Sequence, residues 1–179
     1  MQRNLVAAFM VTMEAEGGDR FVNHPQDPGG ATKWGVSLRL ARRLGLDLDH
    51  DGDVDADDIR LIDEAAARDV FERVFWRGVR GDELPAGLDL AAADAAFHHG
   101  EGAARCLLQR AAGVRVDGIL GPISLRACAA DPAEVLRRLA GVRGVHMSKL
   151  DGWATFGEGW ISRLVDVHAV AKELAAGRA

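Results

Sequence analysis

Apolar residues recur at helical spacing through most of the chain. Leu5, Phe9 and Met13 are four residues apart and are followed by glycines at 17–18, so the pattern predicts an amphipathic helix that ends close to Glu16. Similar patterns predict helices over 36–45, 63–76, 85–99, 102–112 and 121–130, and two long helices between 132 and 176 parted by DGWATFGEGW. No longer stretch alternates, so β structure is limited to a small hairpin near 19–36.

Length and composition agree with this helical pattern. The 179 residues suffice for one compact unit, or for a main domain with a small appended one. Apolar residues make up 48% and charged residues 27%, which is typical of a globular protein. We therefore predict an all-α fold in two lobes, with at most a small hairpin.

Charge and hydropathy narrow the classes of function. A formal charge of -5 disfavours a protein that holds nucleic acid through phosphate contacts. No apolar run approaches the roughly 20 residues of a membrane span. The N-terminal stretch lacks a cleavage site and carries Glu14 and Glu16, so we expect synthesis in the cytoplasm without a leader. Cys106 and Cys128 fall in Ala/Leu-rich helical segments, which is typical of buried thiols, and a disulfide between them is left open.

Candidate chemistry gathers in one short stretch, EAEGGDRFVNHPQDPGGATKWG. Glycosidic bond cleavage needs an acid that protonates the leaving oxygen and a second polar group that handles water or the sugar cation. Glu16 suits the acid, because the C-terminal end of a helix and nearby aromatic residues disfavour its charged form. Asp27 and Thr32 supply the second group, the glycines at 29–30 allow close approach of a sugar, and Trp34 is suited to stack on a sugar ring.

Each of these residues also has a simpler structural interpretation. Glu-Gly pairs recur at 101–102 and 158–159, and a glutamate at a helix end is more often a solvated charge. Asp27 precedes Pro-Gly-Gly and suits an ordinary turn, Trp34 equally suits the core, and Thr32 equally suits a cap on the following helix. Context favours Glu16, because it alone is followed by an acid, a Gly-Gly turn and a threonine in one loop.

The pattern E-G-G at Glu16, followed by P-x-D-x-G-G-x-T-x-x-G over 25–35, resembles glycoside hydrolase family 108. These are N-acetylmuramidases of the lysozyme superfamily, found in phage endolysins and prophage regions. The resemblance continues over 75–88 and over 107–125. The second of these ranges is similar to a predicted peptidoglycan-binding segment that such proteins carry at their C-terminus. It implies that Glu16 is the general acid. The order of glutamate, acid and threonine also resembles phage-type lysozymes, which implies catalytic roles for Asp27 and Thr32.

The chain departs from the family pattern in two places. Asp19 stands where an aromatic residue usually follows E-G-G. The family also tends to carry a run with phenylalanine, aspartate and asparagine before a central glycine, where this chain has AAADAAFHHG. Asp94 matches the acid, while His98 and His99 stand where asparagine and serine are expected. We therefore predict substrate contacts for Asp94 and His98 in this run, in addition to the contact predicted above for Trp34.

The segment DLDHDGDVDADD, 47–58, matches a twelve-residue calcium loop with a glycine at its sixth position. Its acidic residues occupy positions one, three, five, seven, nine and twelve: Asp47, Asp49, Asp51, Asp53, Asp55 and Asp58. Aspartate at position twelve resembles dockerin-type loops, with one helix following from Ile59. We expect a structural calcium ion here and no cofactor for catalysis. The competing interpretation of this segment is a solvated acidic linker. Elsewhere in the chain, the spacing of the histidines does not match a zinc site.

These features together predict a lysozyme-like, two-lobed enzyme. A catalytic lobe over 1–100 would carry the acid, and a helical segment over 101–179 would hold peptidoglycan. The expected reaction is hydrolysis of the bond between N-acetylmuramic acid and N-acetylglucosamine, by a monomeric endolysin that reaches the periplasm with a holin-type partner. The alternatives are a noncatalytic wall-binding or secretion-associated protein on the same fold, and a dockerin-type calcium-binding module.

Overall fold

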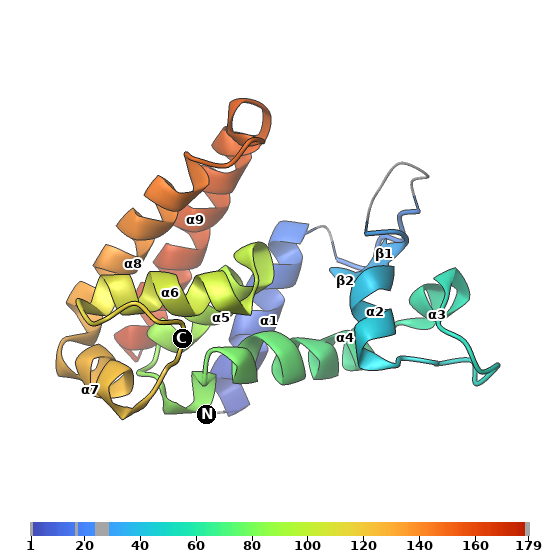
Figure 1. The fold of residues 1–179 in the computed structure, drawn as a ribbon, viewed down its shortest axis with the longest axis horizontal. Helices are drawn as coiled ribbons and strands as arrows, with labels where there is room; N and C mark the ends of the chain where they lie inside the picture. The colour runs from blue at the N-terminus through green and yellow to red at the C-terminus, as the bar shows by residue number, and fades with distance from the viewer. Residues whose placement is uncertain (1, 17, 24–28, 178–179) are drawn as a thin grey trace. The chain divides into compact units, whose positions relative to one another are not determined.

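The computed structural model describes residues 2–16, 18–23 and 29–177 (Figure 1). The chain begins with α1 (Gln2–Glu16) and a hairpin of β1 (Thr32–Lys33) and β2 (Val36–Ser37). The elements that follow are α2 (Leu38–Leu44), α3 (Ala56–Leu61), α4 (Glu64–Val70), the π-helix η1 (Phe71–Trp76), the 3₁₀ helix η2 (Gly81–Glu83), α5 (Leu88–His99), α6 (Glu101–Ala112), α7 (Pro122–Ala130), α8 (Pro132–Met147) and α9 (Trp153–Ala175). The predicted helical fold with a small hairpin is confirmed.

The chain divides into two compact units. The larger unit comprises Met1–Thr12 and Glu72–Ala179, and the smaller unit comprises Met13–Phe71. Both α1 and η1 contribute residues to each unit. The helices after residue 100 belong to the same unit as α5, and a separate peptidoglycan-binding role for them stays a prediction. None of the helices over the described residues combines the length and apolar character that crossing a membrane requires.

Local capping sets the helix boundaries in the smaller unit. The Ser37 hydroxyl accepts the N–H of Leu40 at the start of α2, and Gly45 ends α2 with a left-handed φ of 66°. The side chain of Asp63 likewise accepts the N–H of Ala66 and caps α4. Because Ser37 is the cap, the interpretation of Thr32 as the cap of the following helix is wrong.

One predicted boundary differs in the larger unit. The glycine-rich stretch 151–160 was expected to separate the last two helices, but α9 already begins at Trp153 and includes Gly157. The ring of Trp153 lies so close that a Cβ at Gly157 would come within 2.8 Å of it. Packing of a ring against this bare backbone offsets the low helix propensity of glycine. Figure 1 shows α8 and α9 lying side by side as a helical pair.

Helix α5 forms the centre of the larger unit. Every residue from Leu88 to Ala96 is buried, and α5 packs against α6, α8, α9 and η2. A helix buried on all sides is apolar all round, which explains the absence of a clear amphipathic pattern here. The thiols lie on neighbouring helices and are both free, and burial raises the pKa of Cys128 to about 11.

A buried ion network crosses this core. The carboxylate of Asp94, on α5, is 0% exposed. It accepts hydrogen bonds from Arg143 on α8 at 2.8 Å and from Arg163 on α9 at 2.7 Å. The hydroxyl of Thr12, on α1, lies 3.4 Å from the same carboxylate. Burial alone would raise the pKa of Asp94, but the two guanidinium groups hold it below its usual value.

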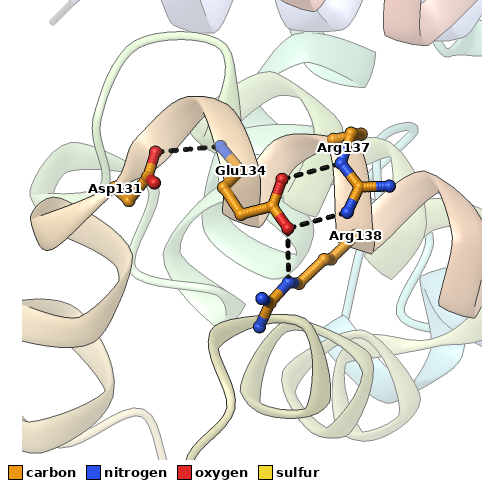
Figure 2. Close-up of polar contacts among 4 residues, drawn as sticks. All are labelled: Asp131, Glu134, Arg137 and Arg138. Carbon is orange, nitrogen blue, oxygen red and sulfur yellow. Dashed lines mark hydrogen bonds and ion pairs between the residues drawn. The ribbon is translucent and has the colours of Figure 1, made fainter.

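The start of α8 carries a second, exposed ion cluster (Figure 2). Asp131 caps the helix by accepting the N–H of Glu134 at 3.1 Å. The carboxylate of Glu134 in turn accepts hydrogen bonds from Arg137 and Arg138, which lower its pKa to about 2. Because this cluster is exposed to solvent, it contributes little to stability.

We expect Asp94→Asn to destabilise the protein by about 3–5 kcal/mol, because two buried arginines would lose their counter-charge. Urea unfolding followed by circular dichroism measures the change. Glu134→Gln is the matched control, since it removes an exposed carboxylate that also contacts two arginines. Equal unfolding midpoints for the Asp94 variant and the parent would contradict a structural role for this network.

Candidate functional site

Glu16 is the last residue of α1, as the sequence predicts. Gly18 follows with a left-handed φ of 67°, and its N–H donates to the carbonyl of Met13 at 3.1 Å. Glu101, by contrast, opens α6, and Glu158 lies inside α9. Glu16 therefore differs from the other two Glu-Gly pairs in ending a helix, where the partial negative charge of the terminus disfavours an anion.

Two of the three predicted catalytic groups fall beyond what the structure describes. The side chain of Glu16 and the whole of Asp27 lie outside the described residues. Thr32 is described and half-buried in β1. Its hydroxyl makes a long hydrogen bond of 3.4 Å to the carbonyl of Gly30. The catalytic roles of all three residues stay predictions.

The hairpin places Trp34 in its turn. Lys33 pairs with Val36 across the hairpin, so Trp34 and Gly35 form a two-residue loop. Their φ angles are 52° and 68°, as a type I′ turn requires. Asparagine and glycine normally fill such positions, and an ordinary side chain there costs about 1–2 kcal/mol. Half-buried Trp34 is therefore not explained by the local preference of the turn.

Asp94 and His98 lie together on α5, in the larger unit. Asp94 has no accessible surface and bonds to two arginines, so its observed contacts are structural, and its contact with a substrate stays a prediction. His98 is half-buried at the end of the helix. Burial, together with Arg163 and Arg143, lowers the pKa of His98 to about 4. His98 is therefore uncharged at neutral pH.

Aromatic contacts around His98 were missed at the level of sequence. Its ring stacks on His99 at 4.3 Å between centroids and meets Trp160 edge-on at 5.8 Å. The ring of His99 meets His146 edge-on at 4.9 Å. Trp153 and Trp160 are seven residues apart, a spacing that places two side chains on one face of a helix. This spacing could have indicated the aromatic cluster, but the glycines of the same segment favoured a break between two helices.

The acidic loop folds around its own backbone. The carboxylate of Asp47 accepts the N–H of Gly52 at 3.2 Å, that of Asp49 accepts the N–H of Asp51 at 3.2 Å, and that of Asp51 accepts the N–H of Asp53 at 3.0 Å. One oxygen of Asp47, Oδ1, is buried and has no hydrogen-bond partner. The pKa of Asp49 is raised mainly by burial and also by the neighbouring carboxylates. The pKa of Asp53 is raised mainly by the negative charge of Asp51.

Five of the six predicted calcium ligands come together in two overlapping groups. Asp47, Asp49 and Asp58 form one group and Asp53, Asp55 and Asp58 the other, each with carboxylate oxygens within 4.8 Å of one another. Asp51 belongs to neither group. The shared residue, Asp58, is buried between them. Oxygen ligands from several carboxylates suit a hard divalent cation.

The helix after the loop begins earlier than expected. It starts at Ala56 rather than Ile59, because Asp55 and Asp58 form a reciprocal capping box. Asp58 also accepts the N–H of Leu48 at 2.6 Å, and these backbone hydrogen bonds lower its pKa. The carboxylate at position twelve is therefore engaged in capping as well, and calcium binding stays a prediction.

Comparison with known proteins decides the family. The model of glycosyl hydrolase 108 matches residues 9–100. The chain belongs to this family. The solved structure of SagA from Brucella abortus is similar, with a TM-score of 0.84 and 32% sequence identity, over 98% of this chain and 97% of that chain. None of the curated proteins matches.

Membership of family 108 makes the chain a glycoside hydrolase. The matched range includes the end of α1, the hairpin, the acidic loop and α5. The resemblance seen in the E-G-G and P-x-D-x-G-G-x-T-x-x-G patterns is thereby confirmed. The match ends at residue 100, and the peptidoglycan-binding role predicted for 101–179 is not part of it.

We expect calcium to raise the melting temperature, because the loop carboxylates repel one another and a cation bound to the folded state stabilises it by mass action. The raised pKa of Asp49 and Asp53 costs stability as pH rises through the carboxylate range, so the calcium shift should be larger at neutral pH than near pH 4. Thermal denaturation in chelator and in millimolar calcium measures it.

Asp47→Asn should reduce this calcium shift, and Asp63→Asn, which changes a helix cap outside the loop, should preserve it. A melting temperature that is the same in chelator and in calcium would sink the calcium prediction.

Proposed function

We propose that the protein is an N-acetylmuramidase that hydrolyses the bond between N-acetylmuramic acid and N-acetylglucosamine in bacterial peptidoglycan. The observation that carries the proposal is the family match over 9–100, which includes the E-G-G pattern at the end of α1. The position of Glu16 on the last turn of an apolar helix supports it, since that environment favours a protonated carboxyl group.

In the proposed reaction Glu16 gives its proton to the glycosidic oxygen as the bond to the sugar carbon breaks. The electron pair of that bond stays with the departing oxygen, and the sugar carbon develops oxocarbenium character. Asp27 or Thr32 would stabilise this cation or position the water that adds to it. The addition of one water balances the reaction and releases a new reducing end at muramic acid.

The hairpin supports a substrate role for Thr32 and Trp34. The 3.4 Å hydrogen bond of the Thr32 hydroxyl is long, so little energy is lost when a sugar or a water replaces it. Trp34 lies two residues further along, in the left-handed turn. An indole ring is suited to stack on the C–H face of a sugar.

The proposed biological setting is an endolysin that is made in the cytoplasm and acts on the wall from the periplasm, as a monomer, with a holin-type partner for export. The competing candidate is a noncatalytic wall-binding or secretion-associated protein on the same fold. The two differ in one measurable respect, because only the enzyme releases new reducing ends from purified peptidoglycan.

Glu16→Gln should lower the release of reducing ends by about 10²- to 10⁴-fold, the usual contribution of a general acid, while the fold and wall binding are retained. Mass analysis of the digested glycan identifies the sugar at the new end. Glu14→Gln and Glu101→Gln are the controls, the first being exposed on the same helix and the second sharing the Glu-Gly pair. Parent-level activity in a folded Glu16→Gln variant would favour the noncatalytic candidate, and a new end at glucosamine would exclude a muramidase.

Trp34→Asn separates the two interpretations of Trp34. If the ring serves the core, the free energy of unfolding should fall, because its buried apolar surface and its contacts are lost. If it serves substrate, the tolerance of asparagine for positive φ should offset that loss and keep the free energy of unfolding close to the parent's. If the ring stacks on substrate, hydrolysis should fall by up to about tenfold, the size of one aromatic contact. Unchanged activity in a variant as stable as the parent would show that the ring is not needed for substrate.

A further inference from the structure

A continuous row of rings crosses three helices of the larger unit. Phe156 and Trp160 lie on α9, His98 and His99 at the end of α5, and His146 on α8. Successive ring centroids, in the order Phe156, Trp160, His98, His99 and His146, are 6.1, 5.8, 4.3 and 4.9 Å apart. We call this set the aromatic row.

Two glycines hold the α9 end of the row in place. A Cβ at Gly152 would lie 3.0 Å from the ring of Trp160 and 3.1 Å from that of Phe156. Trp153 packs on Gly157 in the same way, and its ring centroid is 6.4 Å from that of Trp160. The rings therefore lie against bare backbone, which restricts their rotamers and organises the surface before any ligand binds.

The row is partly accessible and polar in part. Phe156 is 59% exposed, and the other four rings are half-buried. Burial lowers the pKa of His98 to about 4 and that of His99 to about 3, so both imidazoles are neutral near pH 7. His98 Nδ1 and His99 Nε2 are buried and have no hydrogen-bond partner, so the imidazoles present their rings rather than these nitrogens. Phe156 is therefore the most accessible ring of the row.

We propose that the aromatic row is a saccharide subsite that stacks the N-acetylhexosamine rings of a glycan strand. The inference rests on the proposed function and adds a binding surface to it. A sugar presents an apolar C–H face and polar edges, which suits a phenyl and an indole ring that lie beside a set of imidazoles. The row also includes His98, the residue already predicted to contact substrate.

Charge argues for a glycan over a lipid surface. The charged residues between 149 and 160 are Lys149, Asp151 and Glu158, one base against two acids, and all three are exposed. Attachment to an anionic leaflet uses clusters of lysine and arginine, which this segment lacks. Stacking on the acetamido sugars of a glycan strand requires no such basic cluster.

Binding is best measured in the Glu16→Gln protein, which is not expected to cut its ligand. Calorimetric titration with the tetramer of N-acetylglucosamine, joined by tryptophan fluorescence, gives the dissociation constant. Phe156→Ala and Trp160→Leu should each weaken binding by up to about tenfold, the effect of losing one aromatic contact, and Trp160→Phe should restore most of it. Ile161→Ala and Val165→Ala, exposed apolar positions of α9 outside the row, should bind like the parent.

With Glu16 intact, Phe156→Ala should raise KM and leave kcat unchanged, because the row contacts substrate equally before and during the reaction. Circular dichroism checks each fold. Since Phe156 is largely exposed, its variant decides the outcome even if a Trp160 variant unfolds.

Parent-like saccharide affinity in folded Phe156→Ala overturns the subsite. Flotation with vesicles of phosphatidylethanolamine and phosphatidylglycerol that depends on Phe156, without saccharide binding, overturns it in favour of a membrane. These outcomes are distinct from failure of the proposed function, in which the parent protein releases no reducing ends although the tetramer still binds through the row.

Discussion

The carboxylate of Asp94 is the charge on which the larger unit depends. It lies at the centre of α5 and holds Arg143 of α8 and Arg163 of α9, so that one buried anion fixes two helices against a third. Two arginines share this carboxylate, and removing it would take a buried counter-ion from each of them. Because Trp160 and His146 lie on the same two helices, this network also helps to hold Trp160 against His98 and His146 against His99. Stability and the candidate binding surface thus rest on one interaction.

The same residue shows how family position and physical role diverge. Asp94 aligns with an acid expected near the substrate, yet its partners lie 49 and 69 residues away along the chain and enclose it completely. Nothing in AAADAAFHHG distinguishes an aspartate that faces a cleft from one that faces a pair of arginines. His98, one helical turn later, keeps accessible surface at the end of the helix. The two side chains thus differ in accessible surface, while their predicted contacts with substrate stay predictions.

Features with local causes could be predicted from sequence, and features with distant causes could not. The end of α1 before Gly18, the cap at Asp63 and the stop at Gly45 each depend on residues a few positions apart. The start of α9 at Trp153 depends on a ring packed over a glycine, which no propensity for glycine reveals. At the candidate site the order of glutamate, aspartate and threonine is visible in sequence, whereas the row of rings joins three helices and becomes visible only after folding.

The smaller unit departs from local stability in two places. Trp34 occupies a left-handed turn position, which asparagine tolerates better. In the acidic loop, burial is the main cause of the raised pKa of Asp49, and repulsion from Asp51 is the main cause for Asp53. Residues held in sparsely populated backbone conformations cluster at active sites and binding sites. The larger unit shows the opposite case, since its buried charges are compensated by partners on neighbouring helices. The left-handed position of Trp34 agrees with the role in binding proposed for it, whereas the observed contacts of Asp94 join three helices.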